Sequence, residues 1–313
     1  MTRDAFDSEL RTTLDPARVR RGASLGELTT FGVGGPAEWL VEVISSEEAA
    51  AVVKLAQASS VPVTILGGGS NVLVADRGVR GVVLRLRLPT ISQPSSGLVR
   101  AGAGVTINGL VRWTIGRGLA GLEAWAGTPG TVGGAITGNA HYGGTDIGTL
   151  VDRVAVLDLE GRLTEIDARH MEFGYDSSRI QRTHEIVVRA DFRVASGSAD
   201  ALRRTARKSL AHRKQTQPLA LASAGCIFQN PDPARSQLPA GVPASAGALV
   251  DRVGLKGAHV GGARVSPIHA NFIVNEGHAT AADIRTLIEQ ARTAVHRRFG
   301  IDLKYEVVFL GEF

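Results

Sequence analysis

The sequence predicts a mixed α+β fold with more than one domain, on three observations. Strand-like and helix-like segments alternate without a fixed repeat, with more strand in the first two-thirds and the helices concentrated in the last third. The chain has 313 residues, enough for two or three domains of ordinary size. Hydrophobic residues make up 43% and charged residues 21%, a composition typical of globular proteins.

The first half is expected to hold short strands and two main helices. Residues 1–25 are polar and lack a period, which predicts an arm or a short first helix. Ser45 followed by Glu48 is a capping pattern that predicts the start of a helix. We expect strands over 37–45, 61–66 and 79–86 and from Gly97, and helices over 45–60 and 106–118.

The second half is expected to hold a hairpin and the longest helices. The hairpin covers 151–168, with its turn at Glu160–Gly161. The clearest helix is capped by Thr280, ends at Gly300 and carries one apolar stripe. We expect further strands over 185–194, 269–275 and 301–311, and further helices over 196–215 and 244–257.

Charge and composition narrow the class of protein. The formal net charge is +5, but the basic residues are dispersed and aromatic residues are only 5%, so a nucleic-acid partner is poorly supported. The basic excess suits an enzyme with phosphorylated ligands and equally suits a solvated arginine-rich surface. No apolar run is long enough to span a bilayer and no signal peptide is evident, so we expect no membrane partner and a cytoplasmic location. The single cysteine excludes an internal disulfide, and the histidines lack metal-ligand spacing, so we expect no metal.

The first glycine cluster, "LGGGSN", directly follows the short strand expected over 61–66. Three glycines after a buried strand give a turn whose N–H groups can point into one concavity, a nest that suits a diphosphate. The cluster lacks the lysine of a Walker A loop and the spacing of a Rossmann fingerprint. A purely structural turn remains the alternative. The residues concerned are Gly67, Gly68, Gly69, Ser70 and Asn71.

The second glycine cluster lies in "GLEAWAGTPGTVGGAITGNAHYGG", residues 121–144. It has neither a helical nor a strand period, yet it is too apolar to be disordered, so we expect an ordered loop wrapped around a ligand. Backbone groups buried in such a loop need partners. A large ligand with many acceptors, such as a dinucleotide cofactor, would supply them.

Five motifs together make a specific resemblance. "LGGGSNVLV", "GTPGTVGGAITGNAHYGG", "SAGCIFQNP", "HANFIVN" and a final "EV" strand occur in the order seen in the UDP-N-acetylenolpyruvoylglucosamine reductases (UDP-N-acetylmuramate dehydrogenases). The resemblance covers roughly residues 25 to 311. The first two motifs belong to a wider class, the FAD-binding domains similar to vanillyl-alcohol oxidase.

The resemblance implies a two-part FAD-binding domain of the vanillyl-alcohol-oxidase type followed by an α+β substrate domain. It also implies an enzyme that uses FAD and NADPH to reduce UDP-N-acetylglucosamine-enolpyruvate to UDP-N-acetylmuramate, a peptidoglycan precursor, and so serves cell shape and division. A monomer is expected. The expected boundaries are an arm over 1–24, an FAD-binding domain over 25–196 with lobes at 25–90 and 91–196, a substrate domain over 197–300, and a C-terminal strand over 301–313.

The same resemblance assigns site residues. Cys226 occupies the place of the family's proton-donating hydroxyl, and Glu306 matches its C-terminal glutamate. The alternatives are a small core residue at Cys226 and a solvent-facing edge position at Glu306. Cofactor-binding roles are implied for the "GGGSN" residues above and for Gly127, Thr128, Pro129, Gly130, Gly133, Gly134 and Asn139.

One position departs from the family pattern. The family has Tyr-Arg-x-Ser after the hairpin, and its arginine acts on the substrate, whereas here Asp176 takes the arginine's place. An ionised aspartate cannot stabilise an anion, so we expect Arg179 to take the catalytic role or the site to be altered. Substrate contacts are implied for Tyr175, Asn230, Lys214 and His269, with surface charge and a structural histidine as the alternatives for the last two.

Two other functions are compatible with these residues. A different FAD oxidoreductase of the wider class would keep "GGGSN" without needing the set Cys226, Asn230 and Glu306. A degenerate homologue would bind flavin or a UDP-sugar without turnover, and Asp176 is the feature that suggests it.

Overall fold

The computed structural model describes residues 2–233, 238 and 241–313. The chain forms two compact units, each assembled from stretches far apart in the sequence. The first unit comprises the residues up to Ala23, Ala37–Gly68 and Arg80–Ala211, and the second comprises Ser24–Pro36, Gly69–Val79 and His212–Phe313.

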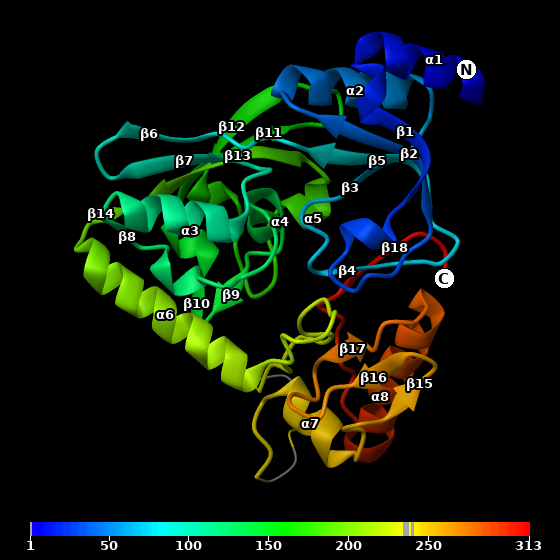
Figure 1. Cartoon of the computed structure of the whole chain (residues 1–313), viewed down its shortest axis with the longest axis vertical. Coiled ribbons are helices and arrows are strands. Elements are labelled where there is room, and N and C mark those ends of the chain that lie inside the picture. The colour runs from blue at the N-terminus through cyan, green and yellow to red at the C-terminus, as the bar shows by residue number, and fades with distance from the viewer. Residues whose placement is uncertain (1, 234–237, 239–240) are drawn as a thin grey trace. The chain divides into compact units, whose positions relative to one another are not determined.

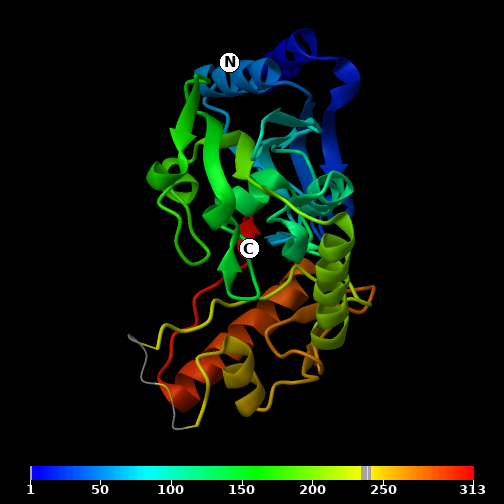
Figure 2. The same cartoon turned by 90° about the vertical axis from the view of Figure 1, so that its left-hand side faces the viewer.

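Four strands form the first sheet, in the order β1-β2-β5-β3. Helices α1 and α2 lie side by side across it in both views (Figures 1 and 2). Phe6 of α1 packs edge-on against the buried Trp39 of β2, with ring centroids 5.0 Å apart, so the N-terminal helix is part of the core. The bounds are Arg3–Thr13 for α1, Val19–Ser24 for β1, Pro36–Val43 for β2, Ser46–Ala58 for α2, Val63–Ile65 for β3 and Val79–Leu86 for β5.

The start of α2 confirms the capping pattern predicted from the sequence. The Ser45 hydroxyl accepts a hydrogen bond from the backbone N–H of Glu48 at 3.2 Å. This bond satisfies one of the N–H groups that an α-helix leaves without an internal partner at its first turn.

Five antiparallel strands form the second sheet of the first unit, in the order β12-β11-β13-β7-β6. Helices α3 and α4 pack on one face, where Leu110 and Ile136 share a core with Ala190 and Phe192 of β13. The bounds are Ile91–Ser95 for β6, Leu98–Gly102 for β7, Ile107–Gly116 for α3, Val132–Thr137 for α4, Val151–Leu157 for β11, Leu163–Asp167 for β12 and Ile186–Arg193 for β13.

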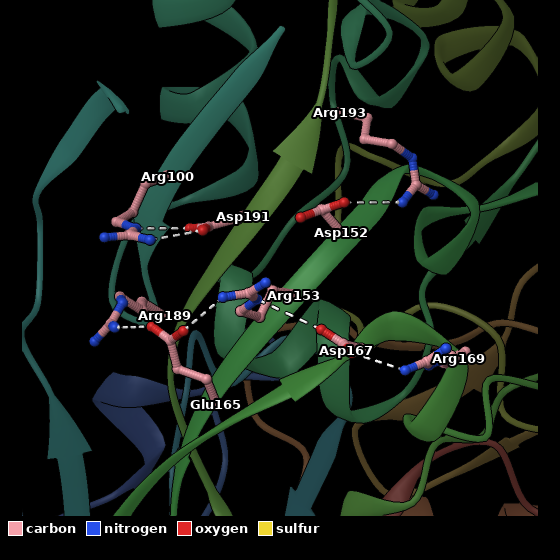
Figure 3. Close-up of polar contacts among 9 residues, drawn as sticks. All are labelled: Arg100, Asp152, Arg153, Glu165, Asp167, Arg169, Arg189, Asp191 and Arg193. Atoms are coloured by element: carbon pink, nitrogen blue, oxygen red, sulfur yellow. Dashed lines mark hydrogen bonds and ion pairs between the residues drawn. The ribbon is translucent and has the colours of Figure 1, made fainter. Parts of the chain in front are cut away.

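The opposite face of this sheet carries cross-strand ion pairs (Figure 3). Arg100 donates two hydrogen bonds of 2.7 Å to the carboxylate of Asp191, and Glu165 accepts from both Arg153 and Arg189. Where the other face packs apolar side chains against the helices, this face carries charged cross-strand pairs, which are compatible with contact with water. The charged face is therefore the solvent side of the sheet.

The second unit holds a three-stranded antiparallel sheet, β15-β16-β17, with the long helix α8 packed on it. The start and end of α8 were both predicted: Thr280 and Asp283 form a capping box, and Gly300 ends the helix in the left-handed conformation. A separate parallel pair joins β4 to β18. The bounds are Val72–Val74 for β4, Ala246–Arg252 for α7, His259–Val260 for β15, Ala263–Val265 for β16, Ile273–Asn275 for β17, Ala281–Phe299 for α8 and Val308–Leu310 for β18.

Short elements complete the described chain. Strand β8 (Leu119–Ala120) pairs with β14 (Ala195–Ser196), and β9 (His141–Tyr142) pairs with β10 (Thr145–Asp146). Helix α6 leads from the first unit into the second. The remaining helical segments are η1 (Pro16–Arg18), η2 (Gly26–Leu28), η3 (Glu123–Trp125), η4 (Ile147–Leu150), η5 (Ala168–His170), α5 (Ile180–Thr183) and α6 (Ala199–Thr216).

The mixed α+β class is confirmed, with three local differences. A short helix, α4, lies within 121–144 where a loop was expected, because Val132 and Ile136 bury one side of it completely. The strands expected over 269–275 and 301–311 are regular only at β17 and β18.

Among the described residues, no helix is long and apolar enough to cross a membrane.

Candidate active site

The glycine turn after β3 presents a run of open backbone donors. Among the residues that the structure describes, none accepts a hydrogen bond from the backbone N–H groups of Gly67–Asn71. Gly69 has a φ of +64°, and a Cβ there would overlap the carbonyl group of Leu28, so only glycine fits. Five consecutive donors without an acceptor in the described part of the chain fit the diphosphate of a dinucleotide.

A second glycine loop of the first unit approaches this turn closely. A Cβ added to Gly68 would lie 2.7 Å from the Cα of Gly130, which itself has a φ of +96°. Trp125 is 2% exposed, and its indole Nε1 has no hydrogen-bond partner in the described chain. Such an orphaned buried donor calls for an acceptor from outside the chain. The residues of this loop therefore fit a bound cofactor.

Asn139 closes this loop with its side chain. The residue is 1% exposed and has a φ of +46°, a conformation that asparagine tolerates better than most residues. Its amide donates to the carbonyl of Gly174 at 2.7 Å and accepts from the N–H of Gly148 at 2.9 Å. Asn139 thus fixes the end of the loop to two neighbouring turns.

In the second unit, the structure brings Cys226 and Glu306 onto adjacent stretches of backbone. The carbonyl of Ile227 accepts a hydrogen bond of 2.8 Å from the N–H of Glu306, and an antiparallel bridge joins Phe228 to Tyr305. Both Cys226 and Glu306 are half-buried. Main-chain hydrogen bonds therefore join the backbone stretch that carries Cys226 to the one that carries Glu306.

Asn271 supports the Cys226 stretch, and the sequence reasoning missed it. Its side chain accepts from the N–H of Phe228 at 3.0 Å and donates to the carbonyl of Phe228 at 2.7 Å. Its own carbonyl accepts from the N–H of Ile227 at 2.8 Å. The residue is 3% exposed. A buried asparagine inside the otherwise apolar "ANFIV" was the available signal.

Asn71 bonds to the Glu306 stretch. Its side-chain amide donates to the carbonyl of Glu306 at 3.0 Å, and its own carbonyl accepts from the N–H of Val308 at 3.0 Å. The parallel register of β4 and β18 pairs Val72 with Val308. The last residue of the glycine turn is therefore tied to the strand that follows the glutamate.

The departure from the family pattern, Asp176, lies on a tight turn of the first unit. Its carboxylate pairs with His141, with Oδ1 and Nδ1 2.9 Å apart. Tyr175 is 45% exposed, and its ring centroid lies 5.2 Å from that of His141. Arg179 donates two hydrogen bonds of 3.0 Å to the carboxylate of Glu185. The guanidinium expected to serve the substrate thus has a bidentate protein partner.

The other predicted substrate residues lie in the second unit. The side-chain oxygen of Asn230 accepts from the N–H of Ala246 at the start of α7, at 3.0 Å. Lys214 is exposed near the end of α6. His269 accepts from the N–H of Asn271 through Nδ1 at 3.2 Å, and burial lowers the pKa of its imidazole.

The described residues were compared with the side-chain arrangement of a metal site. Among residues 2–233, 238 and 241–313, no group of three or more His, Cys, Asp or Glu side chains has the arrangement of a metal site. The polar groups described above are backbone N–H donors of the glycine turn, and a thiol, a carboxylate and amides of the second unit. Groups of these kinds can bind phosphates and move protons.

Fold and site together define the class. The fold is mixed α+β, and residues 37–167 match the family model "FAD binding domain", which places the chain among the flavoproteins. The predicted fold of the vanillyl-alcohol-oxidase type is confirmed. A grass-pollen glucose dehydrogenase, Phl p 4.0202, shares the fold over 61% of this chain, with a TM-score of 0.50 at 15% identity, and 44% of that chain is covered.

The second half of the chain makes the assignment specific. Residues 217–310 match the model "UDP-N-acetylenolpyruvoylglucosamine reductase, C-terminal domain". A protein named UDP-N-acetylenolpyruvoylglucosamine reductase 2 from Symbiobacterium thermophilum is 40% identical over 95% of this chain and 94% of its own. A protein from Chlamydia pneumoniae named UDP-N-acetylenolpyruvoylglucosamine reductase is 37% identical over 93% of this chain and 92% of its own.

A solved structure agrees with these relatives. The crystal structure of the reductase from Thermus caldophilus superposes with a TM-score of 0.78 at 33% identity, and covers 94% of this chain and 99% of that one. The chain belongs to the UDP-N-acetylenolpyruvoylglucosamine reductase family.

Proposed function

We propose that this protein is an FAD-containing oxidoreductase that uses NADPH to reduce UDP-N-acetylglucosamine-enolpyruvate to UDP-N-acetylmuramate. Family membership over nearly the whole chain supports the reaction. The observation that carries it is the pairing of the Cys226 stretch with the Glu306 stretch. FAD held by the two glycine segments would supply hydride-transfer chemistry between NADPH and the enolpyruvyl double bond.

Cofactor binding is assigned to the two glycine segments. The open N–H groups of Gly67–Asn71 bind the diphosphate as hydrogen-bond donors, with no side-chain cation required. The loop from Gly127 to Asn139 lines the flavin, and its glycines let the backbone approach a flat ring closely. The residues assigned in this loop are Gly127, Thr128, Pro129, Gly130, Gly133, Gly134 and Asn139.

Cys226 is assigned as the general acid. Hydride addition to one carbon of the double bond leaves an electron pair on the neighbouring carbon, next to the carboxylate. The Cys226 thiol gives its proton to that carbon, which forms the second C–H bond, and the thiolate then regains a proton from water. A free thiol ionises near pH 8.5, far below a serine hydroxyl, so cysteine is a competent acid at neutral pH.

Glu306 and the polar residues around it are assigned to orientation and substrate binding. Glu306 is assigned to orient the reacting group, and the hydrogen bond of its backbone N–H to the carbonyl of Ile227 supports this assignment. Asn230 and His269 contact the substrate from the second unit, as does Lys214 through its exposed ammonium group. In the first unit, Tyr175 is assigned to substrate contact. Arg179 is assigned a catalytic role, for which its guanidinium must leave the carboxylate of Glu185 and bind the substrate instead.

The cellular setting follows from the reaction. We place the protein in the cytoplasm as a monomer, with its nucleotide substrates as partners and with neither nucleic acid nor membrane. There it supplies a peptidoglycan precursor, and through the cell wall it supports cell shape and division. Sedimentation of the purified protein at working concentration tests the monomer directly.

The test is an anaerobic stopped-flow measurement of both half-reactions. The purified protein should be yellow, NADPH should bleach its flavin absorbance, and the enolpyruvyl nucleotide should restore the absorbance. Oxidase activity on a sugar without any need for NADPH would instead support another oxidoreductase of the wider class. Reduction by NADPH followed by no reoxidation would support a degenerate homologue. Failure to bind FAD after reconstitution would refute both oxidoreductase functions and leave only a homologue that binds a UDP-sugar without flavin.

A further inference from the structure

Tyr305 directly precedes Glu306, and its ring lies among aromatic neighbours. The ring stacks on that of Phe228, with centroids 6.1 Å apart, and meets the ring of Phe309 edge-on at 5.0 Å. The main chain of Tyr305 also forms an antiparallel bridge with Phe228. A phenylalanine would make the same ring contacts, so packing accounts for the ring but not for the hydroxyl group.

The hydroxyl of Tyr305 bonds to two charged side chains of α8. It donates to the carboxylate of Glu289 at 2.6 Å and accepts from the guanidinium of Arg292 at 3.1 Å. Arg285 pairs with the same carboxylate at 2.7 Å and so fixes Glu289 on the helix. Burial, and then the carboxylate of Glu289, raise the pKa of the Tyr305 hydroxyl, which therefore stays a donor at neutral pH. Charge-assisted bonds of this kind are short and directional, so the phenol is tied to one place on α8.

The backbone on both sides of Tyr305 is bonded to the stretch that carries the proposed general acid. After it, the N–H of Glu306 donates to the carbonyl of Ile227 at 2.8 Å. Before it, the carbonyl of Lys304 accepts from the N–H of Gln229 at 2.9 Å. The segment is thus held between α8, through one side chain, and a neighbouring stretch, through its main chain. Because Glu306 is the next residue, its placement depends on where Tyr305 is held.

We propose that Tyr305 is a positioning residue for the reduction: its hydroxyl, bound by Glu289 and Arg292, fixes the segment from which Glu306 acts. In this role Tyr305 acts through Glu306 and does not need to touch the substrate. The inference rests on the proposed reductase function. Misplacing a reacting group by 1 Å can slow a reaction by about 100-fold, so loss of the hydroxyl should slow flavin reoxidation by about 10- to 100-fold.

The test is a double-mutant cycle on the holoenzyme, with Tyr305→Phe, Glu306→Gln and the two changes combined. Stopped-flow kinetics follow reoxidation of the NADPH-reduced flavin by the enolpyruvyl nucleotide. Y305F should reoxidise about 10- to 100-fold more slowly than the wild type, while flavin reduction by NADPH keeps its rate. In the E306Q background the same change should have almost no effect, because the group that Tyr305 positions is already lost. A merely structural role would slow both backgrounds alike.

A second measurement decides if E306Q reoxidises too slowly to follow. Calorimetry gives the affinity of the oxidised holoenzyme for the enolpyruvyl nucleotide, and stopped flow gives the limiting rate at saturation. Y305F should lower the limiting rate and leave the affinity within about 2-fold of the wild type, as expected for an interaction that matters mainly in the transition state. A loss of affinity as large as the loss of rate would overturn the proposal.

Two controls separate positioning from a general weakening of α8. Thr280→Ala removes a hydrogen bond at the cap of α8 and should reoxidise at the wild-type rate. Glu289→Gln keeps an acceptor for the hydroxyl and should retain more of the rate than Glu289→Leu. Wild-type reoxidation in Y305F, or equal slowing in T280A, would overturn the proposal while leaving the reductase intact. A wild-type protein that fails to reoxidise with the enolpyruvyl nucleotide would overturn the reductase function itself.

Discussion

The side chain of Asn271 is predicted to hold Cys226, the proposed general acid, in place, and Asn271→Ala tests this. The change removes the bonds of 3.0 Å and 2.7 Å that the side chain makes with the N–H and carbonyl of Phe228. Phe228 is 2% exposed, so water cannot replace either bond. Each orphaned buried group costs about 1–3 kcal/mol, so the two together cost about 2–6 kcal/mol of unfolding free energy.

Urea unfolding and stopped-flow kinetics measure the two consequences. The midpoint of unfolding should fall by about 1–2 M. Flavin reduction by NADPH should persist, whereas reoxidation by the substrate should slow, because the Cys226 stretch loses its support. Asn275→Ala is the matched control: Asn275 is also buried and bonded, to Phe31, Gly277 and Ala279, but not to the cysteine stretch. Reoxidation at the wild-type rate in N271A would refute the reasoning.

Three further predictions follow from local geometry. Gly68→Ala should lower the flavin content of the purified protein, measured as the ratio of visible to ultraviolet absorbance, because its Cβ would lie 2.7 Å from the Cα of Gly130. Thr280→Ala should cost about 1 kcal/mol of unfolding free energy through loss of the cap of α8, measured by denaturant titration. Burial holds the pKa of His269 below its ordinary value of 6.5, so unfolding free energy should fall as pH drops through and below 6.5. His269→Gln should flatten that dependence.

Each of these has its own control. Gly116→Ala adds a Cβ with no atom within 4 Å and should leave flavin content unchanged, so equal loss in both glycine variants would point to general instability. Thr280→Ser keeps the capping oxygen and should recover most of the stability. Stability that rises on acidification would contradict the sign expected for His269, because a histidine kept neutral by burial disfavours the folded state at low pH.

Local signals predicted the regular elements well. Ser45 with Glu48, and Thr280 with Gly300, mark helix ends because capping chemistry acts over three or four residues. The hairpin turn near Gly161 was predicted for the same reason, since glycine alone takes that conformation easily. These features depend on neighbours in the sequence, so the sequence displays them.

Features that depend on distant residues were not visible. Nothing local indicates that Asn71 bonds to the carbonyl of Glu306, or that His141 pairs with Asp176. Asn271 was hidden in the same way, because its partner lies at Phe228. Cys226 and Glu306 could be selected by their motifs. Only the structure shows that the backbone stretches that carry them are hydrogen-bonded to each other. The roles assigned to them remain predictions.

Reoxidation of the reduced flavin by the enolpyruvyl nucleotide, compared between wild type, Cys226→Ala and Cys226→Ser, tests the central claim most directly. If Cys226 is the acid, the alanine variant should be reduced by NADPH at the wild-type rate but reoxidise about 10²- to 10⁴-fold more slowly, the usual contribution of a general acid. The serine variant should retain part of the wild-type rate. Equal reoxidation rates in all three proteins would contradict the account and leave Cys226 as a packing residue.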